Sequence, residues 1–181
     1  RNAFAGCASP NIIIPESVKA IGDYAFGGCC SLESIVIPKG VTKITDSAFR
    51  NCTSLKEIII PESVKAIGDY AFAGCTSLES IVIPKGVTMI GNSAFEDCTS
   101  LREITIPEGV TEIQHVTFGG CTSLASITIP ESVTKIRTQV FKDCTSLESV
   151  VVAEGNPVYD SREGCNAIIE TETNTLIAGF K

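Results

Sequence analysis

Nine cysteines and a single histidine are the residues of this 181-residue chain most able to do chemistry. Cysteines form disulfides, bind metals or act as nucleophiles, and their spacing indicates which. Seven of the nine form one regular series, evenly spaced from the second member onward: Cys7, Cys29, Cys52, Cys75, Cys98, Cys121 and Cys144. Zinc ligands occur in short paired spacings that this series lacks, so the sequence predicts no metal site.

The regular spacing favours a row of buried, free thiols. Stacked coils lie about 4.8 Å apart, which brings successive cysteine Cα atoms within reach of a disulfide. Their Cβ atoms would point in parallel and stay equally far apart, whereas a disulfide needs a Cβ separation near ~3.8 Å. We therefore expect the thiols to pack as small hydrophobic groups. A disulfide that uses Cys30 or Cys165, the two cysteines outside the series, stays open.

The remaining polar residues show no catalytic arrangement. His115 occupies a slot that other repeats fill with Asp23, Asp46, Asp69, Asn92 and Thr138, so we expect a solvated polar position there. Carboxylates such as Glu57 and Glu103 are present, but no nucleophile, base and orienting group cluster together. The sequence predicts no catalytic residue, no cofactor and no enzymatic activity.

The cysteine series is one column of a 23-residue repeat. Prolines from Pro15 to Pro130 and phenylalanines from Phe26 to Phe141 recur with the same step, and the unit reads LxxIxIPxxVxxIxxxAFxxCxSL. Strict self-similarity at this period predicts a solenoid. Alternate units resemble each other most closely, which indicates duplication of a 46-residue pair.

Each unit contains the elements that position these columns. The β-branched segment 34–37 predicts a strand, which Pro38 ends because proline has no N–H for a sheet ladder. Asp23 and its equivalents are good N-caps, so the following segment predicts a short helical or 3₁₀ turn. Ala25, Phe26 and Cys29 would lie on the inner face of that turn.

The unit resembles the BspA-type leucine-rich repeat, from residues 2–7 to residues 144–147. The resemblance implies a right-handed leucine-rich-repeat superhelix, an α/β repeat solenoid. Its parallel β-sheet would lie on the concave face and its short helical or 3₁₀ turns on the convex face. It also implies secretion or display on a bacterial cell surface, and binding of host proteins or neighbouring cells. No catalytic residues come with it.

The chain divides into two parts. Residues 1–152 are expected to form the solenoid, with a truncated first coil. Residues 153–181 are expected to form an irregular segment that continues or interrupts the array, with a β-hairpin of residues 167–170 and 175–178 turning around Thr173 and Asn174. Because the chain starts part-way through a unit, we expect it to be a section of a longer array, and its uncapped first coil suggests end-to-end self-association.

Composition excludes other classes of protein. The net charge is −7, and the sequence has no dense basic stripe, so nucleic-acid binding is not expected. No apolar run approaches the ~20 residues that span a bilayer. The hydrophobic content of 44% argues against disorder.

The outward strand positions form the candidate protein-binding face. The residues that we assign to it are Val36, Ile59, Val82, Thr105, Thr128, Val151, Glu33, Lys56, Glu79 and Arg102. Exposed contiguous apolar surface often marks a contact site, although β-branched residues also favour strands for purely structural reasons. The charges alternate in sign from coil to coil, both here and after each proline up to Lys85. This alternation indicates either neutralisation between stacked coils or a charge-coded ligand site.

Two functions remain open. The first is a secreted or cell-surface module that binds a protein ligand, such as a host extracellular matrix or surface protein, through the concave sheet face. The alternative is a structural spacer or stalk that displays other binding domains.

Overall fold

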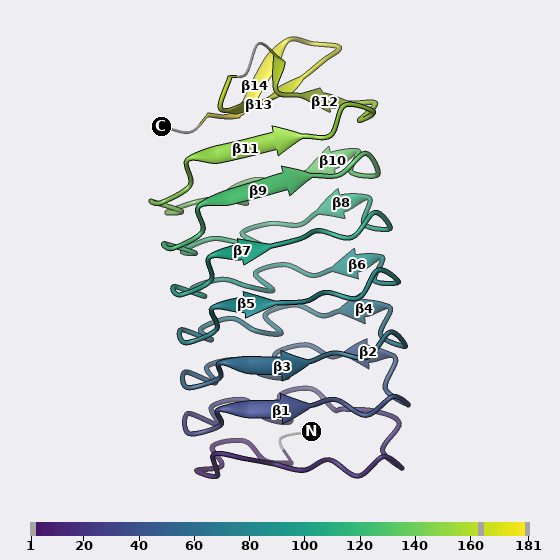
Figure 1. The fold of residues 1–181 in the computed structure, drawn as a ribbon, viewed down its shortest axis with the longest axis vertical. Coiled ribbons are helices and arrows are strands. Elements are labelled where there is room, and N and C mark those ends of the chain that lie inside the picture. The colour runs from purple at the N-terminus through teal and green to yellow at the C-terminus, as the bar shows by residue number, and fades with distance from the viewer. Residues whose placement is uncertain (1–2, 163–164, 180–181) are drawn as a thin grey trace.

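The chain winds into a right-handed stack of coils in the computed structural model, which describes residues 3–162 and 165–179 (Figure 1). One side of the stack carries a row of parallel front strands: β1 (Ser34–Val36), β3 (Glu57–Ile59), β5 (Ser80–Ile81), β7 (Glu103–Ile104), β9 (Ser126–Ile129) and β11 (Ser149–Val152). They pair as β1–β3, β5–β7 and β9–β11, and β3 contacts β5 as β7 contacts β9. Paired residues occupy equivalent positions of successive repeats, as in Val36 opposite Ile59, so the register of the stack is the repeat of the sequence.

A second row of short parallel strands lies on the opposite side of each coil (Figure 1). These back strands are β2 (Lys43–Ile44), β4 (Ala66–Ile67), β6 (Met89–Ile90), β8 (Glu112–Ile113) and β10 (Lys135–Ile136). Ile44 and Ile67 on these strands are fully buried. The predicted fold class is confirmed as a parallel solenoid, and each coil has two strands where the sequence predicted one.

The core consists of columns of identical residues between the two rows of strands. The rings of Phe4, Phe26, Phe49, Phe72, Phe95, Phe118 and Phe141 stack with centroids 5.1–5.9 Å apart and planes within 10° of parallel. Leu32 and its equivalents through Leu124 are fully buried beside this stack. Because each coil is a single turn of the chain, it cannot shield its own apolar side chains from water. The coils above and below it do so.

The predicted helical turn is wrong. Segment 24–28 instead forms tight turns in which Gly27 N donates to Tyr24 O and Cys29 N donates to Phe26 O. Alternate N–H groups leave the coil: Phe26 N donates to Ala48 O of the next coil. Tyr24 has a φ of 59° and Gly28 a φ of 73°, which no right-handed helix contains. Asp46 likewise caps no helix, because its Oδ1 accepts from Asp69 N of the next coil at 3.3 Å.

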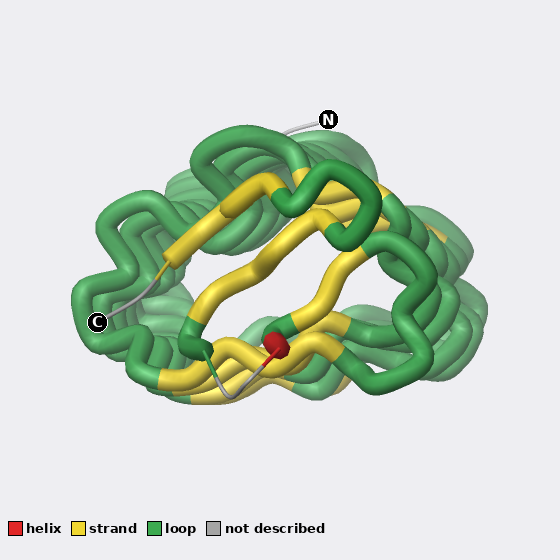
Figure 2. Tube along the Cα trace, turned by 90° about the horizontal axis from the view of Figure 1, so that it is seen from above, coloured by secondary structure: helices red, strands yellow, loops and turns green. Residues whose placement is uncertain are grey.

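The C-terminal segment folds as a three-stranded antiparallel sheet over the end of the stack (Figure 2). Its strands are β12 (Tyr159–Asp160), β13 (Ala167–Glu170) and β14 (Thr175–Gly179), so the predicted hairpin is confirmed. Ile168 is fully buried against the last coil, and β13 contacts β11. Asn166 Oδ1 accepts from Val150 N at 2.8 Å, which ties the sheet to the last front strand.

Within the described residues, no helix is long and apolar enough to cross a membrane.

Candidate functional site

The cysteine column lies in the core, where each thiol meets the backbone of the coil before it. Cys29, Cys52, Cys75, Cys98 and Cys121 are fully buried and all nine cysteines are free, which confirms the expected row of buried thiols. Each Sγ in the row donates to the carbonyl oxygen of a phenylalanine in the preceding coil, as Cys75 does to Phe49 O at 3.2 Å. Sequence analysis missed this acceptor because it belongs to the backbone.

Burial makes these thiols poor nucleophiles. Desolvation is the main cause that raises the pKa of Cys52 to about 12 and the pKa of Cys144 to about 11. The same cause raises the pKa of Cys75 and Cys98 well above its usual range. Because the thiolate is the reactive form, this column is structural.

The two cysteines outside the column differ from it and from each other. Cys30 is exposed, with its Sγ 3.6 Å from Asn51 O, and Cys165 is half-buried. Neither forms a disulfide within the described part of the chain. His115 is exposed, as predicted, and its Nδ1 lies 2.8 Å from Thr138 Oγ1. In residues 3–162 and 165–179, no three histidine, cysteine or acidic side chains gather as a metal site would require.

All ten residues predicted for the binding face are exposed along the front strands. The aliphatic members of this face are strongly exposed: the exposed fractions are 55% for Val36, 52% for Ile59, 81% for Val82 and 49% for Val151. Their neighbours in the same strands, such as Ile35 and Ile58, point inward and are buried. The front strands therefore hold an aliphatic row on the surface, which grades into Thr105 and Thr128.

The structure extends this row by one residue. Ile13 is 92% exposed, and Asn11, two residues before it, bridges Ser34 at the start of β1, two residues before Val36. Sequence analysis did not include Ile13, because the first unit is one residue shorter than the others between its cysteine and its proline. Counting back one repeat length from Val36 would have found it.

A groove of about 800 Å³ crosses the front strands β5, β7 and β9. Val82, Thr105 and Thr128 line it, as do Glu62 and Lys85, each of which directly follows a proline that comes after a front strand. Clefts of this size are typical of binding sites, and three of the predicted face residues line this one.

The charge ladder is only partly formed. Lys56 Nζ lies 3.1 Å from Glu33 Oε2, as neutralisation between stacked coils predicts. Glu79 and Arg102 form no ion pair within the described residues, and neither do the charged residues that follow the prolines: Glu16, Lys39, Glu62, Lys85, Glu108 and Glu131. Most charged side chains on this face therefore form no ion pair among the described residues.

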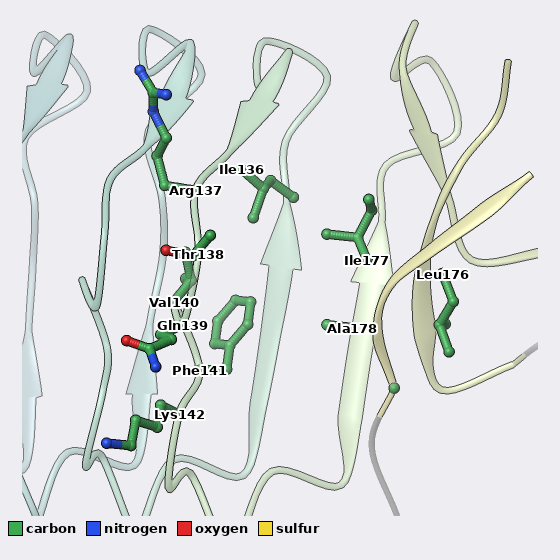
Figure 3. Close-up of a pocket in the computed structure, with 11 residues that line it drawn as sticks. Ile136, Arg137, Thr138, Gln139, Val140, Phe141, Lys142, Leu176, Ile177 and Ala178 are labelled. Carbon is green, nitrogen blue, oxygen red and sulfur yellow. The ribbon is translucent and has the colours of Figure 1, made fainter. Parts of the chain in front are cut away.

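A second cleft, of about 530 Å³, lies between the last coil and β14 (Figure 3). Ile177 and Ala178 of β14 point into it, toward residues 136–142 of the coil. The cleft lies between the C-terminal sheet and the stack, and none of the predicted face residues lines it.

Comparison with known families gives a match over most of the chain. The BspA type leucine-rich repeat region matches residues 1–118 and 65–165 and is found in six copies. No curated protein matches the sequence.

Solved structures of bacterial leucine-rich repeat proteins have the same fold. A protein from Bacteroides ovatus is 39% identical over 85% of this chain, with a TM-score of 0.81. The leucine-rich repeat protein of T. pallidum is 36% identical over 81% of the chain and 69% of its own length, with a TM-score of 0.75. The pneumococcal vaccine antigen PcpA is 28% identical over 88% of the chain and 42% of its own length, with a TM-score of 0.77. The chain spans 40% of the length of the Bacteroides protein.

Proposed function

Because the chain belongs to the BspA-type leucine-rich repeat family, we propose that its front face binds a protein ligand at a bacterial cell surface or outside the cell. Leucine-rich repeats are protein-interaction modules, and this fold is generally non-enzymatic. We propose adhesion through a host extracellular matrix or surface protein as the specific role. The similarity to the pneumococcal vaccine antigen supports surface display.

The observation that carries the proposal is the exposed aliphatic row on the front strands. Water-exposed apolar surface is costly unless a partner covers it, and this row continues through adjacent coils from Ile13 to Val82. The groove across β5, β7 and β9 gives part of that surface a concave shape. On the back strands, by contrast, Met89 is the one exposed large hydrophobic residue among those that the structure describes.

The proposal is tested by binding to immobilised matrix proteins. The wild-type chain should bind at least one of fibronectin, laminin and collagen saturably, and Ile59→Asp should abolish that binding because it places a charge in the middle of the row. Unchanged affinity of the variant would move the site away from the front face. Failure of the wild-type chain to bind any of a broad panel of host surface proteins would favour the spacer function instead.

A further inference from the structure

The groove on the front face contains hydroxyl groups that the fold does not use. Ser80, Thr105, Ser126 and Thr128 line it, and none forms a side-chain hydrogen bond within residues 3–162 and 165–179. Several hydroxyls elsewhere in the coils are engaged, as in Thr76 Oγ1, which donates to Thr53 O at 3.2 Å. The groove hydroxyls are therefore available to the backbone of a bound segment, since a hydroxyl both donates and accepts.

The charges of the front face are distributed unevenly along the stack. Toward the N-terminal end, cations alternate with glutamates, and Lys56 pairs with Glu33. Beyond Arg102, every charged residue at the outward strand positions and just after the strands is acidic: Glu103, Glu108, Glu131, Glu148 and Glu154. None of these glutamates has an ion-pair partner within the described residues.

Apart from Arg102, which directly precedes Glu103, the cations of the same coils lie at other positions. Lys135 Nζ lies 3.8 Å from Glu112 Oε1, which Arg137 Nε also contacts, and all three residues are on the back strands or directly after them. Lys142 Nζ lies 4.0 Å from Asp143 in the turn. Beyond Arg102, the front face therefore carries glutamates and no cation among the described residues, and such a surface favours a positively charged partner.

From the apolar row, the free hydroxyls and this charge gradient, we infer that the groove binds an extended, two-part protein segment. Its aliphatic side chains cover Val82 in the groove and Ile59 outside it, and its lysines or arginines face Glu103 in the groove and Glu108 and Glu131 outside it. The segment runs along the stack, across the front strands, and its backbone meets the hydroxyls of the groove. This inference rests on the proposed function, because it specifies the partner of the same face.

Synthetic peptides test the inference directly. The probe is a labelled twelve-residue peptide with three valines in one half and three lysines in the other, separated by serine and glycine. A scrambled peptide of the same composition and a peptide with glutamate in place of lysine are its controls. Dissociation constants are measured by fluorescence anisotropy at ~20 mM and ~200 mM salt, because attraction between exposed charges weakens with screening.

We expect the two-part peptide to bind at least fivefold more tightly than the scrambled one, and the glutamate peptide not to bind. The double variant Glu103→Gln/Glu131→Gln should weaken binding at least fivefold at low salt. Asp143→Asn, which removes one charge from the turn side of the stack, should leave the affinity unchanged. Amide chemical-shift changes should map to residues 80–82, 103–105 and 126–128.

Two results would overturn the inference. One is equal affinity for the scrambled peptide; the other is equal weakening by the Asp143→Asn control, since both indicate attraction by net charge alone. A failure of this kind leaves the proposed function standing if Ile59→Asp still abolishes binding to a matrix protein, because the face would then bind a partner of different chemistry. If the peptide shows no selectivity and Ile59→Asp also leaves binding to a matrix protein unchanged, the front face is not the binding site.

Discussion

At the residue scale, each buried thiol contributes a hydrogen bond as well as apolar volume. The carbonyl oxygen of Phe26 accepts from Cys29 N in its own coil and from Cys52 Sγ in the next. The thiol thus binds an acceptor that is already buried, which joins neighbouring coils at their inner turn. A serine in this column would keep the donor but lose the apolar contact that a thiol makes with the core.

Thiol accessibility follows from this arrangement. In the native protein at pH 8, we expect a thiol-specific disulfide reagent to label Cys30 within seconds and the column from Cys29 to Cys121 only after unfolding. The reason is that the column is fully buried, whereas Cys30 is exposed. Mass spectrometry of labelled peptides measures each site, and Cys30→Ser should remove the fast phase. Rapid labelling of Cys75 in the folded protein would contradict the structure.

The shifted pKa values predict loss of stability in alkali. Unfolded thiols release their protons near pH 9, whereas Cys52 retains its proton to about pH 12. The unfolded state therefore binds fewer protons over this range, so the free energy of unfolding falls as pH rises from about 9 toward 12. The slope is at most about 1.4 kcal/mol per pH unit for each such thiol. Urea unfolding at pH 8 and 10 measures it, and Cys52→Ala should be less sensitive to pH; equal sensitivity would contradict the burial of Cys52.

The sequence predicted the residue columns well. A fixed repeat length places Phe72, Cys75 and Leu78 at equivalent positions of every coil, and their burial follows from their apolar side chains. The spacing does not reveal which backbone atoms the thiols bind, because every residue type carries the same carbonyl group. Ile13 was missed for a different reason. The first unit is one residue shorter than the others, so the column of outward residues was counted from the second unit onward.

At the scale of elements, packing between coils explains why one turn position carries glycine in every second coil. One turn position has positive φ in successive coils and alternates between glycine and a short polar residue: Gly28, Asn51, Gly74, Asp97, Gly120 and Asp143. Asn51 Oδ1 lies 2.3 Å from the place where a Cβ on Gly74 would be. Since each side chain occupies the space above the next coil's glycine, two neighbouring coils cannot both carry one without a shift. The alternation of glycine and a polar residue at this one position thus has a packing cause.

A matched pair of glycine variants separates backbone strain from this packing. Gly6 and Gly74 have φ values of 73° and 74°, but a Cβ on Gly6 would meet nothing within 4 Å. Gly6→Ala should cost only the strain of the left-handed conformation, about 1–2 kcal/mol. Gly74→Ala should cost more, because Asn51 must also move. Urea unfolding measures both, and equal costs would show that the alternation does not arise from packing.

The sequence predicted the front strands but not the turns or the back strands. β-branched residues and the proline that follows them mark the segment 34–37 as a strand whatever surrounds it, and the observed strand covers 34–36 of it. The back strands carry too short a pattern, and they exist because neighbouring coils offer backbone partners. Asp46 suggested a helix cap because its short carboxylate can accept from a nearby backbone N–H. In the structure it does accept from a backbone N–H, but from Asp69 N of the next coil.

At the scale of the whole molecule, the C-terminal sheet protects one end of the stack. Asn156 links them with four hydrogen bonds: its Nδ2 donates to Pro130 O and Val133 O, and its Oδ1 accepts from Val158 N and Tyr159 N. A solenoid exposes its core wherever the next coil is missing, so such a cover stabilises the final coils.

Removal of that link should loosen the end of the stack. We expect Asn156→Ala to lower the free energy of unfolding by about 1–3 kcal/mol, because it leaves buried backbone groups without partners. Hydrogen exchange should quicken in β11 and β13 and stay unchanged in β3. Asn11→Ala, which removes one exposed contact with Ser34 at the other end of the stack, is the control and should change stability by less than ~0.5 kcal/mol. An equal effect of the two variants would contradict the covering role of the C-terminal sheet.

In the proposed function, the front face binds the protein ligand and the back of the stack does not. The most direct measurement compares Val82→Asp with Met89→Asp, two exposed apolar residues in the same repeat, on the front face and on the back strand β6. With circular dichroism verifying the fold of each, their affinities for a bound matrix protein are measured by surface plasmon resonance. We expect at least tenfold weaker binding for Val82→Asp and wild-type binding for Met89→Asp. Equal affinities, or loss of binding only in Met89→Asp, would contradict this proposal.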